Sequence, residues 1–234
     1  MISSTSIKVS FILSCFNVQE TVSKSIDSIL NQTHKNLEIL LMDDGSTDET
    51  FKICSNYERE NSEIILFRNK SNIGLTKSLN ILYKNSSGDF IARQDADDFS
   101  HKERIDKQLK FINSNNLDGC TTRAKIIGTK KIIPQFSRFL PINLALKYKN
   151  PFIHGSLLLK REAFFDNNGY DEKFVYAQDY KLMKDLISSN YKIRIMNQAL
   201  YSLNMKNNIS SNFRSEQAYY ADCVRKGISP RDLT

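Results

Sequence analysis

Hydrophobic and polar positions alternate along the first half of the chain with two periods, one typical of strands and one typical of helices. Short runs rich in β-branched and aromatic residues predict buried strands, and they cover residues 8–14, 37–42, 64–67 and 89–93. Apolar residues at helical spacing predict amphipathic helices after these runs, over residues 21–30, 46–57, 75–83 and 101–112. This alternation predicts an α/β fold with a mostly parallel sheet and helices on both of its faces.

The pattern becomes less regular after about Leu117. It predicts a hairpin, a short helix, a strand, a helical turn, a longer helix, a strand and a closing helix, over residues 124–133, 143–148, 156–159, 161–165, 178–188, 193–203 and 213–225. No internal repeat, low-complexity tract or linker divides the sequence. We therefore expect a single domain over residues 1–234, with a first lobe over about 1–120, a second lobe over about 121–205 and a C-terminal helical tail over 206–234.

The charge balance narrows the classes of partner. Lys and Arg total 33 against 26 for Asp and Glu, so the formal net charge is +7. The basic residues are scattered, and no long basic run indicates a nucleic-acid-binding tail. Phosphorylated small molecules and anionic membrane surfaces remain as candidate partners.

Cysteine usage and the N-terminus bear on the compartment. The four cysteines are far apart and form no C-x-x-C pair, which favours reduced thiols and a cytoplasmic protein over a disulfide framework or a zinc site; they are Cys15, Cys54, Cys120 and Cys223. The first residues lack the basic and long apolar regions of a signal peptide. No stretch of about 18 apolar residues predicts a transmembrane helix.

The most informative polar feature is a cluster of three carboxylates, Asp95, Asp97 and Asp98, directly after the strand predicted at 89–93. Such a cluster repels itself unless a cation or a donor-rich ligand lies among the charges. Carboxylates at the end of a strand suit a hard divalent metal that also carries substrate phosphates. The cluster therefore predicts a Mg²⁺ or Mn²⁺ site, and oxygen ligands do not separate these two ions. The alternative is an acidic turn that caps the helix predicted at 101–112.

Polar residues follow the other predicted strands as well. Asn17 comes after the first strand, and Asp43-Asp44 after the second. Ligands of parallel sheets bind beyond the carboxyl ends of the strands, so one pocket is expected to gather these residues with the acidic cluster. Arg93, immediately before the cluster, balances part of its charge.

A series of short motifs occurs in a fixed order along the chain. They are Ser14-Cys15-Phe16-Asn17, Ser28-Ile29-Leu30-Asn31-Gln32-Thr33, Asp43-Asp44-Gly45-Ser46-Thr47-Asp48, Asn72-Ile73-Gly74-Leu75, Asp95-Ala96-Asp97-Asp98, His154-Gly155-Ser156 and Gln178-Asp179-Tyr180. Taken together over residues 9–201, they resemble the family 2 glycosyltransferases with the GT-A fold, especially bacterial enzymes that build surface polysaccharides. Two positions depart from the usual pattern, Ser14 where Pro is usual and Gln178 where Glu is usual.

The resemblance implies an inverting, metal-dependent hexosyltransferase that moves a sugar from a UDP-sugar to a hydroxyl of a glycan or lipid-linked glycan. It implies a Rossmann-like GT-A sheet whose first lobe binds the nucleotide-sugar and whose second lobe binds the acceptor. Such an enzyme of surface polysaccharide synthesis would work in the cytoplasm, with peripheral association at the inner face of the membrane. The basic side chains near the C-terminus would suit loose attraction to anionic lipid; they are Arg214, Arg225, Lys226 and Arg231.

On the donor side, the resemblance implies that Asp97 is the metal ligand, with Asp95 and Ala96 nearer the ribose and the metal's outer shell. The cation would neutralise the charge that develops on the departing nucleoside diphosphate. Asp43 would accept the imide N–H of uracil, a donor that cytosine lacks. Asp44 is expected to brace the turn that follows.

Further donor contacts are expected from the first strand end, one lysine and one histidine. The strand-end residues would approach the base or ribose, mainly through the backbone; they are Ser14, Cys15, Phe16 and Asn17. Lys77 would reach the base or the diphosphate, with a solvated helix lysine as the alternative. His154 would contact the diphosphate or the acceptor, with a hydrogen-bonded structural histidine as the alternative.

On the acceptor side, Asp179 is the expected general base, because an acceptor hydroxyl is a poor nucleophile until its proton is being removed. The alternative role for Asp179 is a negative charge at a helix N-terminus. Gln178 would contact the acceptor or donor without charge.

Three other classes of protein are alternatives to a glycosyltransferase. A receiver domain needs an aspartate after the third strand, where Arg68-Asn69-Lys70 stands instead. A dinucleotide-dependent oxidoreductase needs a G-x-G-x-x-G motif after the first strand, and none is present. A non-catalytic nucleotide-sugar-binding protein of the same fold remains as the alternative because of Gln178.

Overall fold

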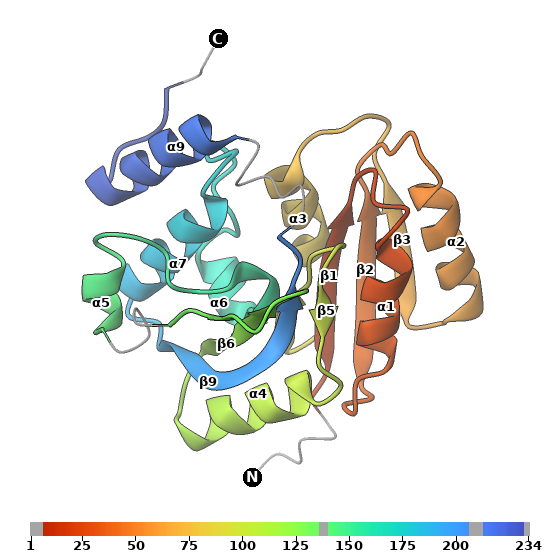
Figure 1. Cartoon of the computed structure of the whole chain (residues 1–234), viewed down its shortest axis with the longest axis horizontal. Coiled ribbons are helices and arrows are strands. Elements are labelled where there is room, and N and C mark those ends of the chain that lie inside the picture. The colour runs from red at the N-terminus through yellow and green to blue at the C-terminus, as the bar shows by residue number, and fades with distance from the viewer. Residues whose placement is uncertain (1–6, 136–139, 206–212, 232–234) are drawn as a thin grey trace.

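Helices cover both faces of one curled nine-stranded sheet in the computed structural model, which describes residues 7–135, 140–205 and 213–231 (Figure 1). The strands are β1 Val9–Cys15, β2 Leu37–Asp43, β3 Ile64–Arg68, β4 Phe90–Arg93, β5 Phe99–Ser100, β6 Gly119–Ile126, β7 Ile132–Ile133, β8 Leu158–Lys160 and β9 Ile193–Leu203. The helices are α1 Val22–Leu30, α2 Thr50–Glu60, α3 Leu75–Lys84, α4 Arg104–Ser114, α5 Ile142–Ala145, α6 Arg161–Asp166, α7 Gln178–Ser188 and α9 Arg214–Lys226, with a 3₁₀ turn, η3, at His154–Ser156.

The sheet has a parallel half and a mixed half. Its strand order is β3-β2-β1-β4-β8-β6-β9-β5, with β7 paired to β6. Strands β3, β2, β1 and β4 are parallel, whereas β8 runs antiparallel to both β4 and β6. The chain proceeds outward from β1 through β2 to β3 and then returns through α3 to β4 on the other side of β1. This reversal of strand order creates a switch point between β1 and β4, where ligands of open α/β sheets bind.

Two hydrophobic cores lie on opposite faces of the sheet. Alternate residues of β1 divide between them, because successive side chains of a strand point to opposite faces. Phe11 and Leu13 pack with apolar residues of α1, α2 and α4, whereas Ile12 packs with those of α3, α6 and α7. Burial on both faces explains why β1 and β2 are almost continuously hydrophobic rather than alternating.

The predicted fold class is confirmed, and the main differences in the elements come after β4. Strand β5 and the start of β6 were not predicted, because β5 has two residues and β6 begins with the small and polar run Gly119–Arg123. Strand β8 begins at Leu158 rather than at 156, since the preceding residues form η3. Helix α4 begins at Arg104, three residues later than predicted.

The C-terminal region contains α9, close to the helix predicted over residues 213–225. Residues 206–212 and 232–234 of the predicted tail, and residues 1–6, lie outside the described part of the chain. The lobe boundaries near residue 120 stay a prediction. None of the described helices has the length and apolar composition needed to span a bilayer.

Candidate active site

The carboxyl ends of the four parallel strands place the predicted donor residues at one edge of the sheet. In the strand register, Cys15 lies opposite Asp43, and Asp43 lies opposite Arg68. Arg93 ends β4 on the other side of β1. The sequence-predicted clusters after β1, β2 and β4 are therefore neighbours in space.

The loops after β1 and β2 are hydrogen-bonded to each other. Asn17 has a left-handed backbone (φ 51°), its N–H donates to Ser46 Oγ at 3.0 Å, and its Oδ1 accepts the Thr47 N–H at 2.9 Å. Cys15 is fully buried, and hydrogen bonding with Cys54 together with burial raises the pKa of its thiol well above the usual range. The Cys15 side chain is thus turned into the core, which leaves its backbone as the part that faces the strand-end edge.

The other two residues of this first motif differ in exposure. Ser14 is half-buried within β1, and Phe16 is exposed immediately after it. Phe16 therefore offers an apolar side chain at the edge where a nucleotide base is expected.

Asp43 is already engaged within the protein. Its buried carboxylate forms an ion pair with Arg68, at 3.2 Å between Oδ2 and Nε, and its Oδ1 accepts the Ser46 N–H at 3.4 Å. The Arg68 guanidinium lies 3.8 Å from the centroid of the Phe51 ring. Arg68 is half exposed and lines a cavity of about 420 Å³ together with Gly45, Ser46, Thr47, Asn69 and Lys70. A base that pairs with Asp43 would therefore share this carboxylate with Arg68 or displace it.

Asp44 holds the loop before α3. It accepts the N–H groups of Ile73 and Gly74, both at 3.0 Å, and an Asn69 side-chain N–H at 2.7 Å. Asp44 therefore stabilises the loop before α3, and not only the turn that follows β2. Lys77, which follows in the first turn of α3, is exposed, so the structure leaves both of its predicted roles open.

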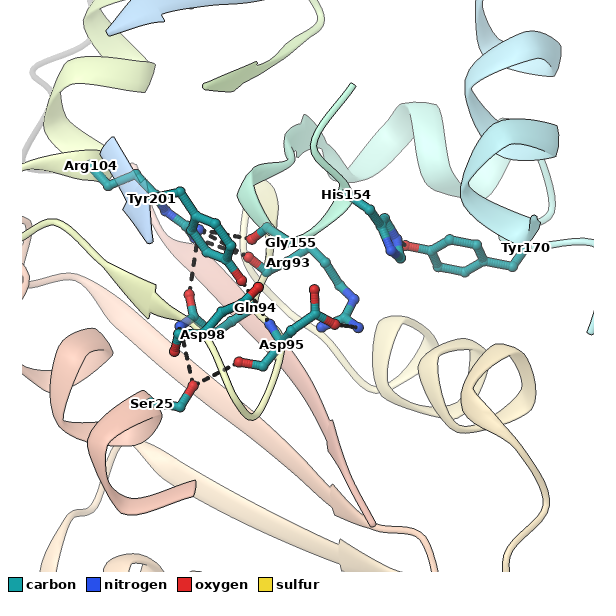
Figure 2. Close-up of polar contacts among 10 residues, drawn as sticks. All are labelled: Ser25, Arg93, Gln94, Asp95, Asp98, Arg104, His154, Gly155, Tyr170 and Tyr201. Carbon is teal, nitrogen blue, oxygen red and sulfur yellow. Dashed lines mark hydrogen bonds and ion pairs between the residues drawn. The ribbon is translucent and has the colours of Figure 1, made fainter. Parts of the chain in front are cut away.

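The acidic segment is fixed by contacts from distant parts of the chain (Figure 2). The Asp95 carboxylate pairs with Arg93 at 2.6 Å, and the Asp95 N–H donates to the Tyr201 hydroxyl at 3.0 Å. The Ser25 hydroxyl of α1 donates to the Asp95 carbonyl at 2.9 Å. The Asn204 N–H donates to Asp98 Oδ1 at 2.6 Å. Strands β4 and β9 and helix α1 thus position the segment together.

The three carboxylates differ in what surrounds them. Burial and the nearby charge of Asp95 raise the pKa of Asp97 to about 6 and that of Asp98 to about 8. Asp98 is 1% exposed, and its carboxylate accepts the main-chain N–H of Asn204, whereas Asp97 is half-buried. Ala96, between them, is buried against the core. The segment thus holds more negative charge than its surroundings neutralise.

A divalent cation fits this segment by charge and by ligand type. The described residues contain no group of three His, Cys, Asp or Glu side chains arranged to enclose a metal ion. An ion held by one or two carboxylates and completed by substrate phosphates and water needs no such group, and this is how Mg²⁺ is usually bound. Asp97, with Asp95 beside it, would hold the ion.

Asp179 lies in the first turn of α7 and is half-buried. Its Oδ2 accepts a hydrogen bond from the Asn150 side chain at 2.8 Å. The residue before α7, Ala177, has a left-handed backbone (φ 53°), which sets the direction in which the helix begins. Gln178 is buried beside it. Asp179 therefore combines partial exposure with a fixed orientation.

His154 lies within reach of the charges of two predicted site residues, Asp95 and Asp179. Its Nε2 is 2.8 Å from the Tyr170 hydroxyl (Figure 2). Burial, and then the charge of Arg93, lowers the pKa of His154 to about 4, against the opposing effects of Asp179 and Asp95. His154 is therefore neutral at pH 7, and it is close enough to both carboxylates to feel their charges.

Several residues around this site were not predicted from the sequence. Tyr201 and Asn150 lie far in sequence from the residues that they contact, and no local pattern predicts such contacts. The importance of Arg104 could have been predicted, because it is a charged residue within the apolar face of the predicted helix. In the structure it is 0% exposed. No pattern in the sequence indicates that Tyr170 contacts the site.

Comparisons with known proteins place the chain in a family. The sequence profile described as glycosyl transferase family 2 matches residues 10–169. EpsE of Bacillus subtilis (strain 168), named as a glycosyltransferase, is 34% identical over 174 residues, 70% of this chain and 60% of its own. WfgD of Escherichia coli, named as a UDP-Glc:alpha-D-GlcNAc-diphosphoundecaprenol beta-1,3-glucosyltransferase, is 32% identical over 184 residues, 78% of this chain and 70% of its own.

Solved structures share the fold. Staphylococcus aureus TarS 1–349 in complex with UDP-GlcNAc has a TM-score of 0.73 at 20% identity, over 88% of this chain and 61% of its own. The mannosyltransferase PcManGT of Pyrobaculum calidifontis, in complex with GDP-Man and Mn²⁺, has a TM-score of 0.73 at 17% identity, over 96% of this chain and 66% of its own. The chain thus spans about three fifths of EpsE and of the TarS fragment. The fold is GT-A, and the chain belongs to glycosyl transferase family 2.

Proposed function

We propose that the protein is an inverting, metal-dependent glycosyltransferase that moves a hexose from a UDP-sugar to a hydroxyl of a glycan or lipid-linked glycan in bacterial surface polysaccharide synthesis. One observation carries this proposal. Two carboxylate sites, Asp95–Asp97 at the strand ends and Asp179 at the start of α7, lie near the same 3₁₀ turn, because Asp95 Oδ2 lies beside Gly155 and the charges of both Asp95 and Asp179 act on the neighbouring His154. A donor site and a general base that are this close can act on one reaction.

The chemistry assigns one role to each site. The acceptor oxygen attacks the anomeric carbon while Asp179 takes its proton, and the bond from that carbon to the phosphate oxygen breaks with its electron pair. Attack from the face opposite the leaving group inverts the anomeric centre. A bound divalent cation supplies charge neutralisation for the departing diphosphate. Asp97, with Asp95, is the side chain that would hold it.

Asn150 would orient the base in this scheme. Its amide donates to one carboxylate oxygen of Asp179 at 2.8 Å, which leaves the other oxygen for the acceptor hydroxyl. Neutral His154, fixed by Tyr170, would act as a hydrogen-bonding group rather than as a cation.

The choice of UDP rests on Asp43 and on the relatives. WfgD is named for a UDP-Glc donor, and TarS is seen with UDP-GlcNAc, whereas PcManGT is seen with GDP-Man. A panel of UDP-Glc, UDP-GlcNAc, UDP-Gal and GDP-Man with Mn²⁺ tests the base by thermal stabilisation and by hydrolysis. We expect stabilisation by UDP-sugars alone. Stabilisation by GDP-Man alone would show that the uracil assignment is wrong.

The catalytic assignment is tested by Asp179→Asn. This change keeps the shape of the side chain and removes the base, so transfer should fall at least about 100-fold while donor affinity stays constant. The anomeric configuration of the product, read by NMR, tests inversion. Full transfer by Asp179→Asn would remove Asp179 from its role. Donor binding without hydrolysis or transfer by the wild type would favour a non-catalytic nucleotide-sugar-binding protein.

A lipid-linked acceptor would bring the protein to the inner face of the membrane. The predicted contact through α9 is weakened, because Arg225 and Lys226 are paired with Asp222 at 3.3 and 2.6 Å. The segment over residues 140–149, which contains α5, suits this contact better. It exposes Leu140, Leu144 and Tyr148 beside Lys147 and Lys149, and it contains no acidic residue.

This segment leads directly to Asn150 and hence to Asp179. Each lysine near an anionic surface contributes about 1 kcal/mol, so binding should weaken with salt. We expect sedimentation with anionic vesicles at low salt and its loss in Lys147→Ala/Lys149→Ala, with Arg225→Ala/Lys226→Ala as the control. Equal loss in both double variants, or no sedimentation by the wild type, would exclude this contact.

A further inference from the structure

Arg93 is a buried cation that is only partly satisfied. Its side chain ends β4 with 1% exposure, and its Nη2 forms an ion pair with Asp95 Oδ1 at 2.6 Å. Its Nε and Nη1 are buried and have no hydrogen-bond partner within residues 7–135, 140–205 and 213–231. A buried guanidinium with free donors costs stability. The contact of this guanidinium with Asp95 indicates a role beyond packing.

Arg104 provides an internal comparison, because it is equally buried in the same region. Its guanidinium donates to the main-chain oxygen of Arg93 at 3.1 Å and to that of Gly155 at 3.0 Å. It also lies over the ring of Phe11, 5.0 Å from the centroid. Arg104 therefore joins backbone segments, whereas Arg93 contacts a carboxylate of the donor site (Figure 2).

Asp95 is held from three directions. Arg93 holds one carboxylate oxygen, and the Tyr201 hydroxyl accepts the main-chain N–H. The second oxygen faces Gly155, where an added Cβ would lie 2.6 Å from Asp95 Oδ2 and 2.2 Å from the Tyr201 hydroxyl. The Asp95 side chain is nevertheless 31% exposed. A side chain that is both fixed and accessible is suited to contact a ligand.

Arg93 also faces the acceptor side of the site. Its positive charge acts on His154 and Tyr170, and Figure 2 shows the side chain extending from β4 toward Asp95 on the side of these two residues. Among the described residues, Asp95 is the acid that forms an ion pair with the Arg93 guanidinium, and the charge of Asp98 also acts on it.

We propose that Arg93 is a positioning residue for donor binding, which fixes the Asp95 carboxylate toward the nucleotide-sugar and offsets the repulsion among Asp95, Asp97 and Asp98. This role rests on the proposed function, since it requires a donor bound at these acids. Loss of Arg93 removes the ion pair that fixes one oxygen of Asp95, so the carboxylate is free to rotate away from the ligand. The affinity for a metal-bound nucleoside diphosphate should therefore fall, and acceptor binding should not.

The experiment measures the binding of UDP with Mn²⁺ by calorimetry, without sugar transfer, in the wild type, Arg93→Met and Arg93→Lys. We expect at least a tenfold rise in Kd for Arg93→Met and partial rescue by Arg93→Lys, which keeps the charge but loses the planar guanidinium. The donor KM should rise while the acceptor KM stays constant. Arg104→Lys is the matched control, and it should change thermal stability with little change in Kd.

A double-variant cycle ties the effect to Asp95. If Arg93 acts through this carboxylate, Arg93→Met in an Asp95→Asn background should cost little further affinity. If Arg93→Met does not fold, Arg93→Lys with and without Asp95→Asn supplies the same comparison. A folded Arg93 variant that keeps the wild-type Kd, or additive losses of affinity in the cycle, would show that Arg93 is not a positioning residue. Either result would leave the proposed function unchanged. Failure of the wild type to bind any nucleoside diphosphate with metal would overturn the proposed function and this role together.

Discussion

Buried acids lie at both ends of the parallel strands, and the surroundings of Glu38 at the amino end differ from those of the acids that follow β4 at the carboxyl end. At the amino end, Glu38 accepts hydrogen bonds from Ser10 and Ser87 and pairs with Lys8 at 2.7 Å. Burial alone would raise the pKa of Glu38, but these partners lower it to about 2. At the carboxyl end, the acids after β4 have raised pKa values, about 6 for Asp97 and about 8 for Asp98.

The difference separates an acid whose charge the fold stabilises from acids whose charge the fold does not stabilise. Donors surround Glu38 on all sides, so it needs no ligand and links β1, β2 and the loop before β4. The acids after β4 lack enough donors, so the folded chain is left with a charge that a cation or ligand can neutralise. Local rules of stability are expected to fail at functional sites, and here they fail at only one end of the strands.

The largest expected effect comes from Asp97→Asn. Removal of the proposed metal ligand should reduce transfer by about 100-fold or more, since such charge neutralisation is worth several kcal/mol. Thermal stability without ligand should stay constant or rise, because the variant removes a partly buried charge that Asp95 repels. Activity assays and thermal unfolding measure the two effects. A variant that loses stability as well as activity would show that Asp97, like Glu38, stabilises the fold.

Gly155→Ala tests the packing against Asp95. The added methyl would lie 2.2 Å from the Tyr201 hydroxyl, so the variant should lose about 1–3 kcal/mol of stability and part of its donor affinity. Gly128→Ala in the β6–β7 hairpin is the control, because no atom lies within 4 Å of its added Cβ and only its left-handed backbone is strained. Equal effects on donor affinity would argue against a tight contact at Gly155.

Glu38→Gln should show the reverse of Asp97→Asn. Loss of the charge weakens hydrogen bonds that are worth about 1.5–3 kcal/mol when one partner is ionised, so the free energy of unfolding should fall by about 2 kcal/mol. The kcat measured well below the unfolding temperature should not change. A reduced kcat in a fully folded variant would mean that the amino end affects the reaction.

The smallest expected effect is the pH dependence of the stability that Glu38→Gln loses. The pKa of Glu38 is about 2 in the folded protein against a usual value of 4.5, so its contribution is present above about pH 4.5 and is lost as the pH falls toward 2. The difference in unfolding free energy between the wild type and Glu38→Gln should therefore shrink over this range. Denaturant unfolding at several pH values measures it, and a constant difference would contradict the assignment.

The first half of the fold followed from the sequence because its strands and helices are local and strongly periodic. The hydrophobic runs of β1 and β2 and the helical spacing of α1 are determined by burial on both faces. Strand β5 did not follow, because its two residues are a strand only through pairing with Ser202 and Tyr201 of β9. Such pairing depends on contacts about 100 residues apart.

The candidate site divides in the same way. Family motifs identified Asp43, Asp97 and Asp179, whose roles stay predictions. The contact between Arg68 and Asp43 did not follow from any motif, because it depends on the register of β2 and β3. The same is true of Asn150 and Asp179, which a long loop and a helix bring together.

Gly155 has a consequence for recombining enzymes of this kind. It belongs to the second half of the chain, yet its Cα lies directly beside Asp95 of the first half, with no room for one further carbon atom. A chimaera that takes its second half from a related protein is therefore expected to need glycine at this position. A larger residue would push against Asp95 and Tyr201, even if both halves folded well in their parent proteins.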